Sequence, residues 1–598
     1  MANPFPAAPA LLRRTSGRRP TGATGLALAL CLCLVPSLGA ARAASAAALD
    51  AVATAESASP GVAIRPEASG LNGAVTSGHH LASQAGLEVL RRGGNAVDAA
   101  VTMAGVLAVV RPHMNGVGGD AFALIRPAAT GEVHALNASG RAGSAATPAF
   151  FRALGHARVP FSGPTAITVP GAVSGWAEAL DVHGTIDLAT ALAPAIALAR
   201  DGFVVSQTLA EDLSKAAPRL NEAGRAIFMP GGRLLQPGDV LRNPALARTL
   251  ATIAEEGPEA FYEGPIGRRL TAFVEAEGGH LRPGDFAAHA PNWVEPVAVE
   301  WRGLRVHTLP PNSQGVVLLQ MLGMAETRPL DRHAPNSAPL LHELVEIGRL
   351  AFADRDQWVA DPAFHEPPLT RLLAPAYLAS RAALVSPEAG GGRAPGFTPD
   401  PTVAEGLSGD TVYLSAVDAD GNAVSWIQSL FGSLGSRLVE PETGVVLHNR
   451  GAGFSLEDGH PNQVAPGKRP FHTLMATLIT GTGETPAERP FVMTIGTPGG
   501  SGQPQFVTQA LVEMELFDRS PQQAVEAPRY RMGAGRAIEL EGRVPGTTVD
   551  GLEERGHEVS VEPDWTANFG SLTVIRRMPS GVLRTGADMR REAAALAW

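Results

Sequence analysis

The chain of 598 residues contains only two cysteines, Cys31 and Cys33, and both lie in one apolar run near the N-terminus. A mature protein that has lost this run would contain no cysteine, which excludes disulfide bonds, a cysteine nucleophile and cysteine-ligated zinc. The chain also lacks a cluster of basic residues, and its formal net charge is -10. Nucleic acid is therefore not expected as a partner.

Two motifs that would suggest a cofactor or a metal lack the context that they need. Residues 116–121 fit a loose dinucleotide-binding pattern, but a helix is expected before them and a strand after them, the reverse of what pyrophosphate binding requires. His342-Glu343 suggests zinc, yet no second histidine follows at the helical spacing of metalloproteases. We therefore expect no cofactor and no metal.

The N-terminus has the features of a secretory signal peptide. Residues 1–25 carry four arginines and no acidic residue, residues 26–40 are apolar, and Ala41-Arg42-Ala43 offers small residues at both cleavage positions. The apolar run is shorter than the roughly 20 residues of a membrane span. We expect removal of residues 1–43 and export to the periplasm or the extracellular space without a stable membrane anchor. Arg13-Arg14 leaves a twin-arginine route open.

Two adjacent helices are predicted after the leader. Apolar residues at helical spacing predict a helix over residues 80–92, which Gly93-Gly94 would end. Asn95 is then expected to cap a helix over residues 96–110, which is apolar almost all round and should be buried. Residues 169–385 favour further helices with short strands, including a strand over residues 301–309.

Residues 409–429 are predicted to form two strands joined by a tight turn, because residues 412–417 and 423–429 are rich in strand-forming side chains and flank Asp-Ala-Asp-Gly-Asn. Thr411 begins the first strand, directly after a tract rich in proline and glycine. If the Asp410–Thr411 bond were cut, the new α-amine, with a pKa of about 7.7 to 8.0, would lie beside the hydroxyl as a general base. In the simpler interpretation Thr411 only starts a strand.

These segments resemble the γ-glutamyltransferase family of N-terminal-nucleophile hydrolases. The small subunit of that family begins with a threonine, which a serine, a Gly-Asn turn and a second hydroxyl residue follow; here these are Thr411, Ser415, Gly421-Asn422 and Ser429. The resemblance extends to ASQAGLEVLRRGGNAVDAAV near the start and GADMRREAAALAW at the end. It implies an α/β fold, the four-layer αββα sandwich, in which a large subunit (44–410) and a small subunit (411–598) form one domain.

The resemblance also implies the site residues. Thr411 would be the nucleophile, Ser429 would position its hydroxyl and assist self-cleavage after Asp410, and the N–H groups of Gly499 and Gly500 would form the oxyanion hole. A glycine pair after a strand can approach a ligand closely, although it is more often only a turn. Substrate binding would fall to Arg141, Asn449, His472 and Thr473.

The chain departs from the family where the substrate's amine is held. Gly453 stands in the place of an aspartate that holds the α-ammonium group, and Phe431 in the place of an asparagine or glutamate. The loop between Ser455 and Lys468 is shorter than in members with a lid. Recognition of a free amino group is therefore in doubt, while the catalytic residues are kept.

We expect a self-cleaving amidohydrolase or acyltransferase that transfers the γ-glutamyl group of glutathione and related amides to water or an amine acceptor. The alternative is an acylase for glutaryl or other dicarboxylic monoamides, like the cephalosporin acylases and oxamate amidohydrolases of the wider family. A second alternative is a non-enzymatic binding protein on the same fold.

Overall fold

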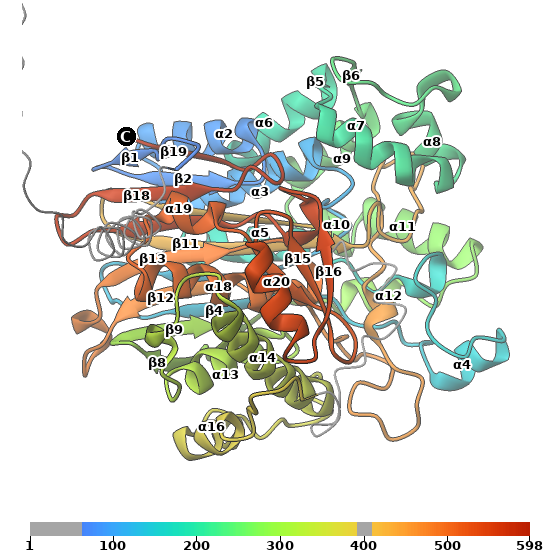
Figure 1. Cartoon of the computed structure of the whole chain (residues 1–598). Helices are drawn as coiled ribbons and strands as arrows, with labels where there is room; N and C mark the ends of the chain where they lie inside the picture. Colours follow the sequence, from blue (N-terminus) through green and yellow to red (C-terminus); the bar gives the residue numbers. More distant parts are fainter. Residues whose placement is uncertain (1–62, 391–409) are drawn as a thin grey trace, which may run out of the picture. The chain divides into compact units, whose positions relative to one another are not determined.

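The computed structural model describes residues 63–390 and 410–598. These residues form two stacked antiparallel sheets with helices on both outer faces, the four-layer αββα arrangement expected from the sequence (Figure 1). The predicted signal peptide lies outside the described residues. Within residues 63–390 and 410–598, no helix has both the length and the apolar character that crossing a membrane requires.

The predicted hairpin forms the centre of one sheet. Strand β10 (Asp410–Val417) pairs with β11 (Ala423–Phe431), and Thr411 lies opposite Ser429. Strands from both sides of the Asp410–Thr411 bond contribute to this sheet. The other members are β19 (Ala594–Ala597) and β2 (Ala74–Ser77) beside β10, and β3 (Asp120–Arg126), β4 (His134–Ala138) and β7 (Asn292–Val294) beside β11.

Alternation along β10 decides which way each side chain faces. Val412 and Leu414 pack into the core beneath the helices, whereas Tyr413 belongs to the core between the two sheets. Thr411 lies two residues before Tyr413 on β10, so its side chain points to the same, inter-sheet side. Ser429, directly opposite on the neighbouring strand, points to that side as well. The strand pattern therefore places both hydroxyl groups on the same side of the sheet.

The second sheet contains the strand that precedes the glycine pair. The strand predicted over residues 301–309 is confirmed for Leu304–Thr308, but Trp301 ends the preceding strand, because Arg302 and Gly303 turn with positive φ (50° and 74°) and make a hairpin. In spatial order the strands are β1 (Ser69–Gly70), β18 (Leu583–Ala587), β17 (Thr573–Arg577), β13 (Phe491–Gly496), β12 (Thr477–Gly481), β9 (Leu304–Thr308) and β8 (Val297–Trp301).

Helices near the top of Figure 1 cover the first sheet. The two helices predicted after the leader are α2 (His80–Arg91) and α3 (Ala96–Val110), and the Asn95 side chain accepts hydrogen bonds from the first turn of α3 as expected. Every residue of α3 is buried. This face also carries α5 (Ala172–His183), α6 (Leu188–Asp201), α7 (Gln207–Ala216), α8 (Glu222–Phe228), α9 (Pro244–Glu256), α10 (Glu259–Tyr262) and α11 (Pro265–Ala276).

Helices α13 (Gly315–Ala325), α14 (Ala338–Trp358), α18 (Gln503–Leu516) and α19 (Pro521–Glu526) cover the second sheet. A small third sheet packs outside them, against α14. It contains β14 (Tyr530–Met532), β15 (Ala537–Glu541) and β16 (Glu558–Glu562), with α20 (Gly546–Glu553) beside it. The remaining short elements are α4 (Pro148–Ala153), α12 (Pro283–Ala287), α15 (Leu369–Leu372), α16 (Pro375–Ala382), β5 (Phe203–Val204) and β6 (Val240–Leu241).

Candidate active site

Two hydroxyl groups and the carbonyl of Asp410 form a short hydrogen-bonded chain. The Thr411 hydroxyl donates to Ser429 Oγ at 3.1 Å, and the Ser429 hydroxyl donates to the Asp410 carbonyl oxygen at 2.8 Å. Both side chains are buried. Antiparallel pairing explains the contact, since directly opposite residues of two strands have neighbouring side chains. The Ser429 hydroxyl therefore lies against the carbonyl of the peptide bond that precedes the predicted nucleophile.

A buried arginine joins this chain. Arg450 donates through Nη2 to Ser429 Oγ at 3.2 Å and through Nη1 to Thr473 Oγ1 at 3.3 Å. Its guanidinium lies 4.2 Å from the ring centroid of Phe431, which ends β11 with an unusual positive φ of 78°. Burial lowers the pKa of Arg450 to about 9, and the charge of Asp120 opposes this shift. Arg450 is therefore still a cation at neutral pH.

Asp120 is the anion that compensates this cation. It begins β3 opposite the serine of β11, and its Oδ1 accepts hydrogen bonds from the backbone N–H groups of Gly140 and Gly171. Its Oδ2 lies 3.1 Å from His472 Nε2 and 3.2 Å from His448 Nδ1. Burial by itself would raise the pKa of Asp120, but the two histidines hold it well below its usual value. Asp120 is therefore a carboxylate with two backbone donors on Oδ1 and two imidazole nitrogens close to Oδ2.

The predicted oxyanion loop lies between β13 and α18. Gly499 and Gly500 both have positive φ (130° and 56°), a conformation that glycine adopts without a steric penalty. The side chain of Gln314 donates to the Gly500 carbonyl at 2.9 Å and so fixes the orientation of that peptide. Among the residues that the structure describes, the N–H groups of the two glycines have no protein acceptor. They are available to stabilise an anion.

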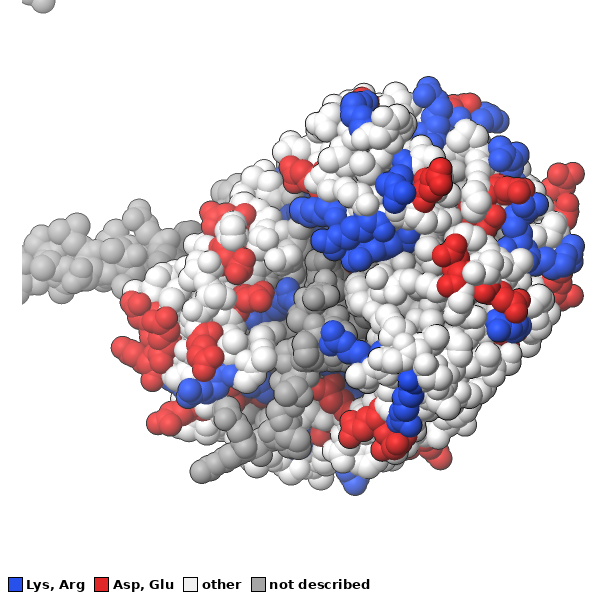
Figure 2. All heavy atoms as spheres, turned by 90° about the vertical axis from the view of Figure 1, so that its right-hand side faces the viewer, with Lys and Arg blue, Asp and Glu red and all other residues white. Residues whose placement is uncertain are grey.

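A cavity of about 660 Å³ opens beside this group of residues. Phe431, Arg450, Thr473 and Ser501 contribute to its wall, and Gly453 lines it without a side chain. Figure 2 views the molecule from the side of α4 and α12 and shows Lys and Arg side chains grouped near the centre of that face. The charged residues that line the cavity are Arg152, Arg158, Arg355, Arg450, Asp356 and Glu457. Because arginines outnumber acids, the cavity suits an anionic ligand.

Of the four residues predicted to bind substrate, only Thr473 lines this cavity. Arg141 donates to the carbonyl of Gly467 at 3.0 Å and lies 3.5 Å from Asp361. Asn449 hydrogen-bonds backbone groups through both ends of its amide. These two side chains have structural partners in the described residues, and their part in substrate binding stays a prediction.

His472, also predicted to bind substrate, is fully buried, and its Nε2 faces Asp120. Burial lowers its pKa to about 3, so the imidazole is neutral at pH 7. In this structure it organises the carboxylate that balances the arginine. Its role toward substrate likewise stays a prediction.

The sequence analysis did not identify Asp120 or Arg450 as functional. A signal for Asp120 was present, since an acid at the head of the apolar strand Asp-Ala-Phe-Ala-Leu-Ile must be paired if it is buried. Nothing in the sequence, however, indicates which distant groups pair with it.

Comparisons with known proteins identify relatives over most of this chain. A family model described as Gamma-glutamyltranspeptidase matches residues 82–598. The chain is 38% identical to the glutathione hydrolase-like YwrD proenzyme of Bacillus subtilis, over 87% of this chain and 98% of that protein. It is 37% identical to the oxamate amidohydrolase proenzyme of Klebsiella pneumoniae, over 88% and 98% of the two chains. The crystal structure of cephalosporin acylase from Bacillus halodurans superposes with a TM-score of 0.82 at 34% identity, covering 90% of this chain and 98% of that one.

Proposed function

Because the chain belongs to the gamma-glutamyltranspeptidase family, we propose that it cuts itself between Asp410 and Thr411 and then uses Thr411 to hydrolyse amides whose acyl group ends in a carboxylate. The hydrogen-bonded chain from Thr411 through Ser429 to the Asp410 carbonyl carries this proposal. It joins the attacking hydroxyl, a hydroxyl that can relay its proton, and the carbonyl that would be attacked.

In self-cleavage the Thr411 oxygen attacks the Asp410 carbonyl carbon; its proton passes to Ser429, and the proton of Ser429 passes to the carbonyl oxygen. This transfer neutralises the negative charge that develops on that oxygen. The C–N bond then breaks as the nitrogen takes this proton, which leaves an ester between Asp410 and the threonine side chain. Water hydrolyses this ester and yields a free carboxylate on Asp410 and a free amine on Thr411.

In turnover the free amine of Thr411 accepts the proton of its own hydroxyl as that hydroxyl attacks the substrate amide. The N–H groups of Gly499 and Gly500 stabilise the tetrahedral oxyanion. The leaving amine takes the proton, and water or a second amine then releases the acyl group. Water gives hydrolysis, and an amine gives transfer.

The cavity supports an acyl group with a terminal carboxylate and no amine. Arg450 can offer two donors in one plane to a carboxylate, and Gly453 and Phe431 provide no acid to hold an ammonium group. A glutaryl or similar dicarboxylic monoamide fits this lining best. γ-Glutamyl amides such as glutathione are the second candidate, which the name of the Bacillus subtilis relative favours.

Self-cleavage is tested by denaturing electrophoresis and N-terminal sequencing of the purified protein. We expect two fragments, the smaller beginning Thr-Val-Tyr-Leu and containing about a third of the chain's 598 residues. The Thr411→Ala variant should remain one chain. An intact wild-type chain, or cleavage at another bond, would refute the proposed catalyst.

The acyl specificity is tested by comparing kcat/KM for three p-nitroanilides: glutaryl, γ-glutamyl and butyryl. We expect the order glutaryl, then γ-glutamyl, then butyryl, since only the first two carry the carboxylate and only the second carries the ammonium group. A strong preference for γ-glutamyl would show that the amine is recognised. Equal rates for all three would refute the role of the arginines.

A further inference from the structure

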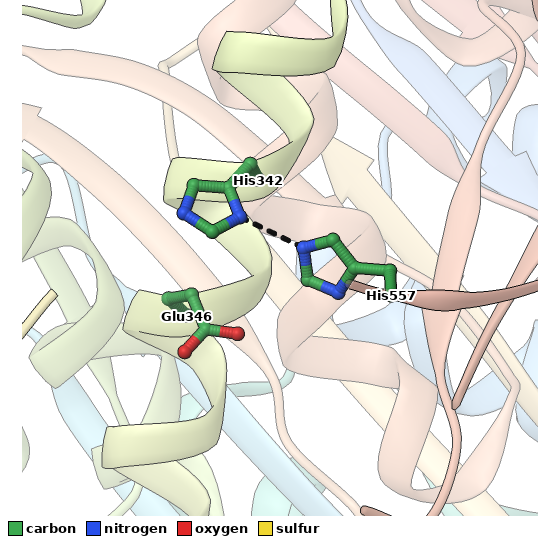
Figure 3. Close-up of side chains that lie close together, drawn as sticks. All are labelled: His342, Glu346 and His557. Atoms are coloured by element: carbon green, nitrogen blue, oxygen red, sulfur yellow. Dashed lines mark hydrogen bonds between the residues drawn. The ribbon is translucent and has the colours of Figure 1, made fainter. Parts of the chain in front are cut away.

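A second cluster of polar side chains lies far from the candidate active site in the sequence. His342 and Glu346 stand one turn apart on α14, and His557 immediately precedes β16; Figure 3 shows the three side chains facing one another. One ligand atom of each lies within 4.8 Å of the others. The exposed fractions of His342, Glu346 and His557 are 3%, 6% and 4%, so three polar side chains converge where little solvent reaches them.

Hydrogen bonds to the two imidazoles show where their lone pairs point. His342 Nε2 lies 2.7 Å from the carbonyl oxygen of Ser386, and because a carbonyl only accepts, this nitrogen carries the hydrogen. Nδ1 of His342 is therefore unprotonated, and its lone pair accepts a hydrogen bond from Nε2 of His557 at 2.8 Å. An imidazole whose other N–H is held by a carbonyl is the usual arrangement of a metal-binding histidine.

His557 and Glu346 each keep an unsatisfied atom. Nδ1 of His557 has no hydrogen-bond partner among the described residues, so the ring can move its proton there and free Nε2. Glu346 accepts the N–H of Gly390 on one oxygen, and its other oxygen is buried without a hydrogen bond in the described residues. Arg349 Nε lies 3.3 Å from that oxygen, and its positive charge would repel a metal ion bound there. A divalent ion, however, carries two charges and bonds directly to the carboxylate, so its attraction to Glu346 is stronger than this repulsion.

We propose that His342, Glu346 and His557 bind a divalent transition-metal ion, with Zn²⁺ as the best match. Two imidazoles and one carboxylate suit zinc, whereas calcium and magnesium prefer oxygen ligands. Tetrahedral zinc with bonds of about 2.1 Å separates its ligand atoms by about 3.4 Å. The two imidazole nitrogens, which are 2.8 Å apart, must therefore separate slightly when the ion binds.

A fourth ligand can come from solvent. A cavity of about 470 Å³ reaches the cluster, and its lining includes His342, Glu343 and Ser386. Water entering by this route would complete the tetrahedron. His557 also explains why the sequence analysis rejected zinc here. The second histidine lies 215 positions after His342 in the chain rather than on the same helix.

The two histidines lie on opposite sides of the Asp410–Thr411 bond. If the chain is cleaved as proposed, the metal would connect the two resulting subunits where the third sheet packs against α14. This consequence rests on the proposed function, whereas metal binding itself does not.

The test is a titration of purified, chelator-treated protein with Zn²⁺, followed by metal analysis, and with Co²⁺, followed by its visible absorption. Wild-type protein should bind one equivalent and give the intense bands of tetrahedral Co²⁺. His557→Gln and Glu346→Gln should each weaken Zn²⁺ binding by at least about 100-fold, since even residues that only orient ligands contribute 10- to 100-fold.

Glu343→Gln is the matched control. Glu343 follows His342 on α14 and lines the same cavity, but its carboxylate pairs with Arg328 at 2.6 Å, outside the cluster. This variant should bind metal like the wild type. Melting curves without metal verify that each variant folds. Wild-type protein that binds no Zn²⁺ at micromolar concentration, a Glu346→Gln variant that binds normally, or a Glu343→Gln variant that loses binding would each overturn the proposal. If wild-type protein stays uncleaved and still binds Zn²⁺, self-cleavage would be refuted and the metal site would be supported.

Discussion

Replacing Ser429 with alanine removes the hydroxyl that faces the bond predicted to break. In the structure this group donates to the Asp410 carbonyl at 2.8 Å and accepts from Thr411 at 3.1 Å. Alanine leaves the strand pairing intact, because the backbone of β11 is unchanged. The Thr411 hydroxyl keeps its place on β10 but loses its proton acceptor, and the carbonyl loses a donor.

The expected effect follows from these two losses. Removing one preorganised donor from an oxyanion site costs about 2.7 to 4 kcal/mol of transition-state stabilisation, or about 10²- to 10³-fold in rate. The loss of the proton acceptor adds to this, so we expect self-cleavage of Ser429→Ala to be at least about 100-fold slower. The amount of folded precursor should change much less.

The rate is measured by cell-free synthesis with a labelled pulse and an unlabelled chase, and the two fragments are followed on denaturing gels. Ser425→Ala is the control, since Ser425 lies four residues earlier on β11 and is equally buried. Its hydroxyl contacts Tyr413 and the N–H of Thr477, and its strand partner is Ser415 rather than Thr411. Cleavage of Ser429→Ala at the wild-type rate, or an equal slowing by Ser425→Ala, would refute the reasoning.

Three further predictions concern the charges around the cavity. Arg450→Lys should reduce the preference for glutaryl over butyryl anilide by about 10-fold or more, because an ammonium cannot replace a planar, doubly donating group; an unchanged ratio would exclude Arg450 from carboxylate binding. Gly453→Asp should raise kcat/KM for γ-glutamyl relative to glutaryl anilide, and no shift in that ratio would mean that the amine is held elsewhere. Asp120→Asn should lower the free energy of unfolding by about 3 to 5 kcal/mol at pH 7, measured with denaturant. Because the folded pKa of Asp120 is depressed, its contribution is present above the unfolded value of about 3.9 and is lost as pH falls toward the folded value, so the variant should show a smaller loss of stability in acid. Equal acid sensitivity of both proteins would contradict this.

Local patterns in the sequence predicted the elements that carry the proposed nucleophile. The strand-forming side chains on both sides of the turn in residues 409–429 predicted the hairpin of β10 and β11, and the Asn95 cap predicted the start of α3. These predictions succeed because each depends on neighbours within one or two turns or along one strand. The hairpin between β8 and β9 was missed. Its turn at Arg302-Gly303 needs positive φ angles, and the apolar residues on both sides of the turn resemble one continuous strand.

The rest of the site depends on contacts between segments far apart in the chain. Asp120 meets His448 and His472 across more than 300 residues, and no local pattern encodes such a meeting. The same applies to Arg450, which would ordinarily be expected on the surface. Buried charges are expensive unless they are paired, so their partners become apparent only once the fold brings them together.

The position of Arg450 would connect the proposed catalysis with specificity. One side of its guanidinium reaches the serine that faces the Asp410 carbonyl, and the other reaches Thr473 in the wall of the cavity. In a site shielded from water, a positive charge acts over a longer range than in solution. The same cation can therefore stabilise negative charge on a reacting oxygen and attract the carboxylate of the substrate. Its charge depends in turn on Asp120, so a change at either residue should affect self-cleavage and substrate selection together.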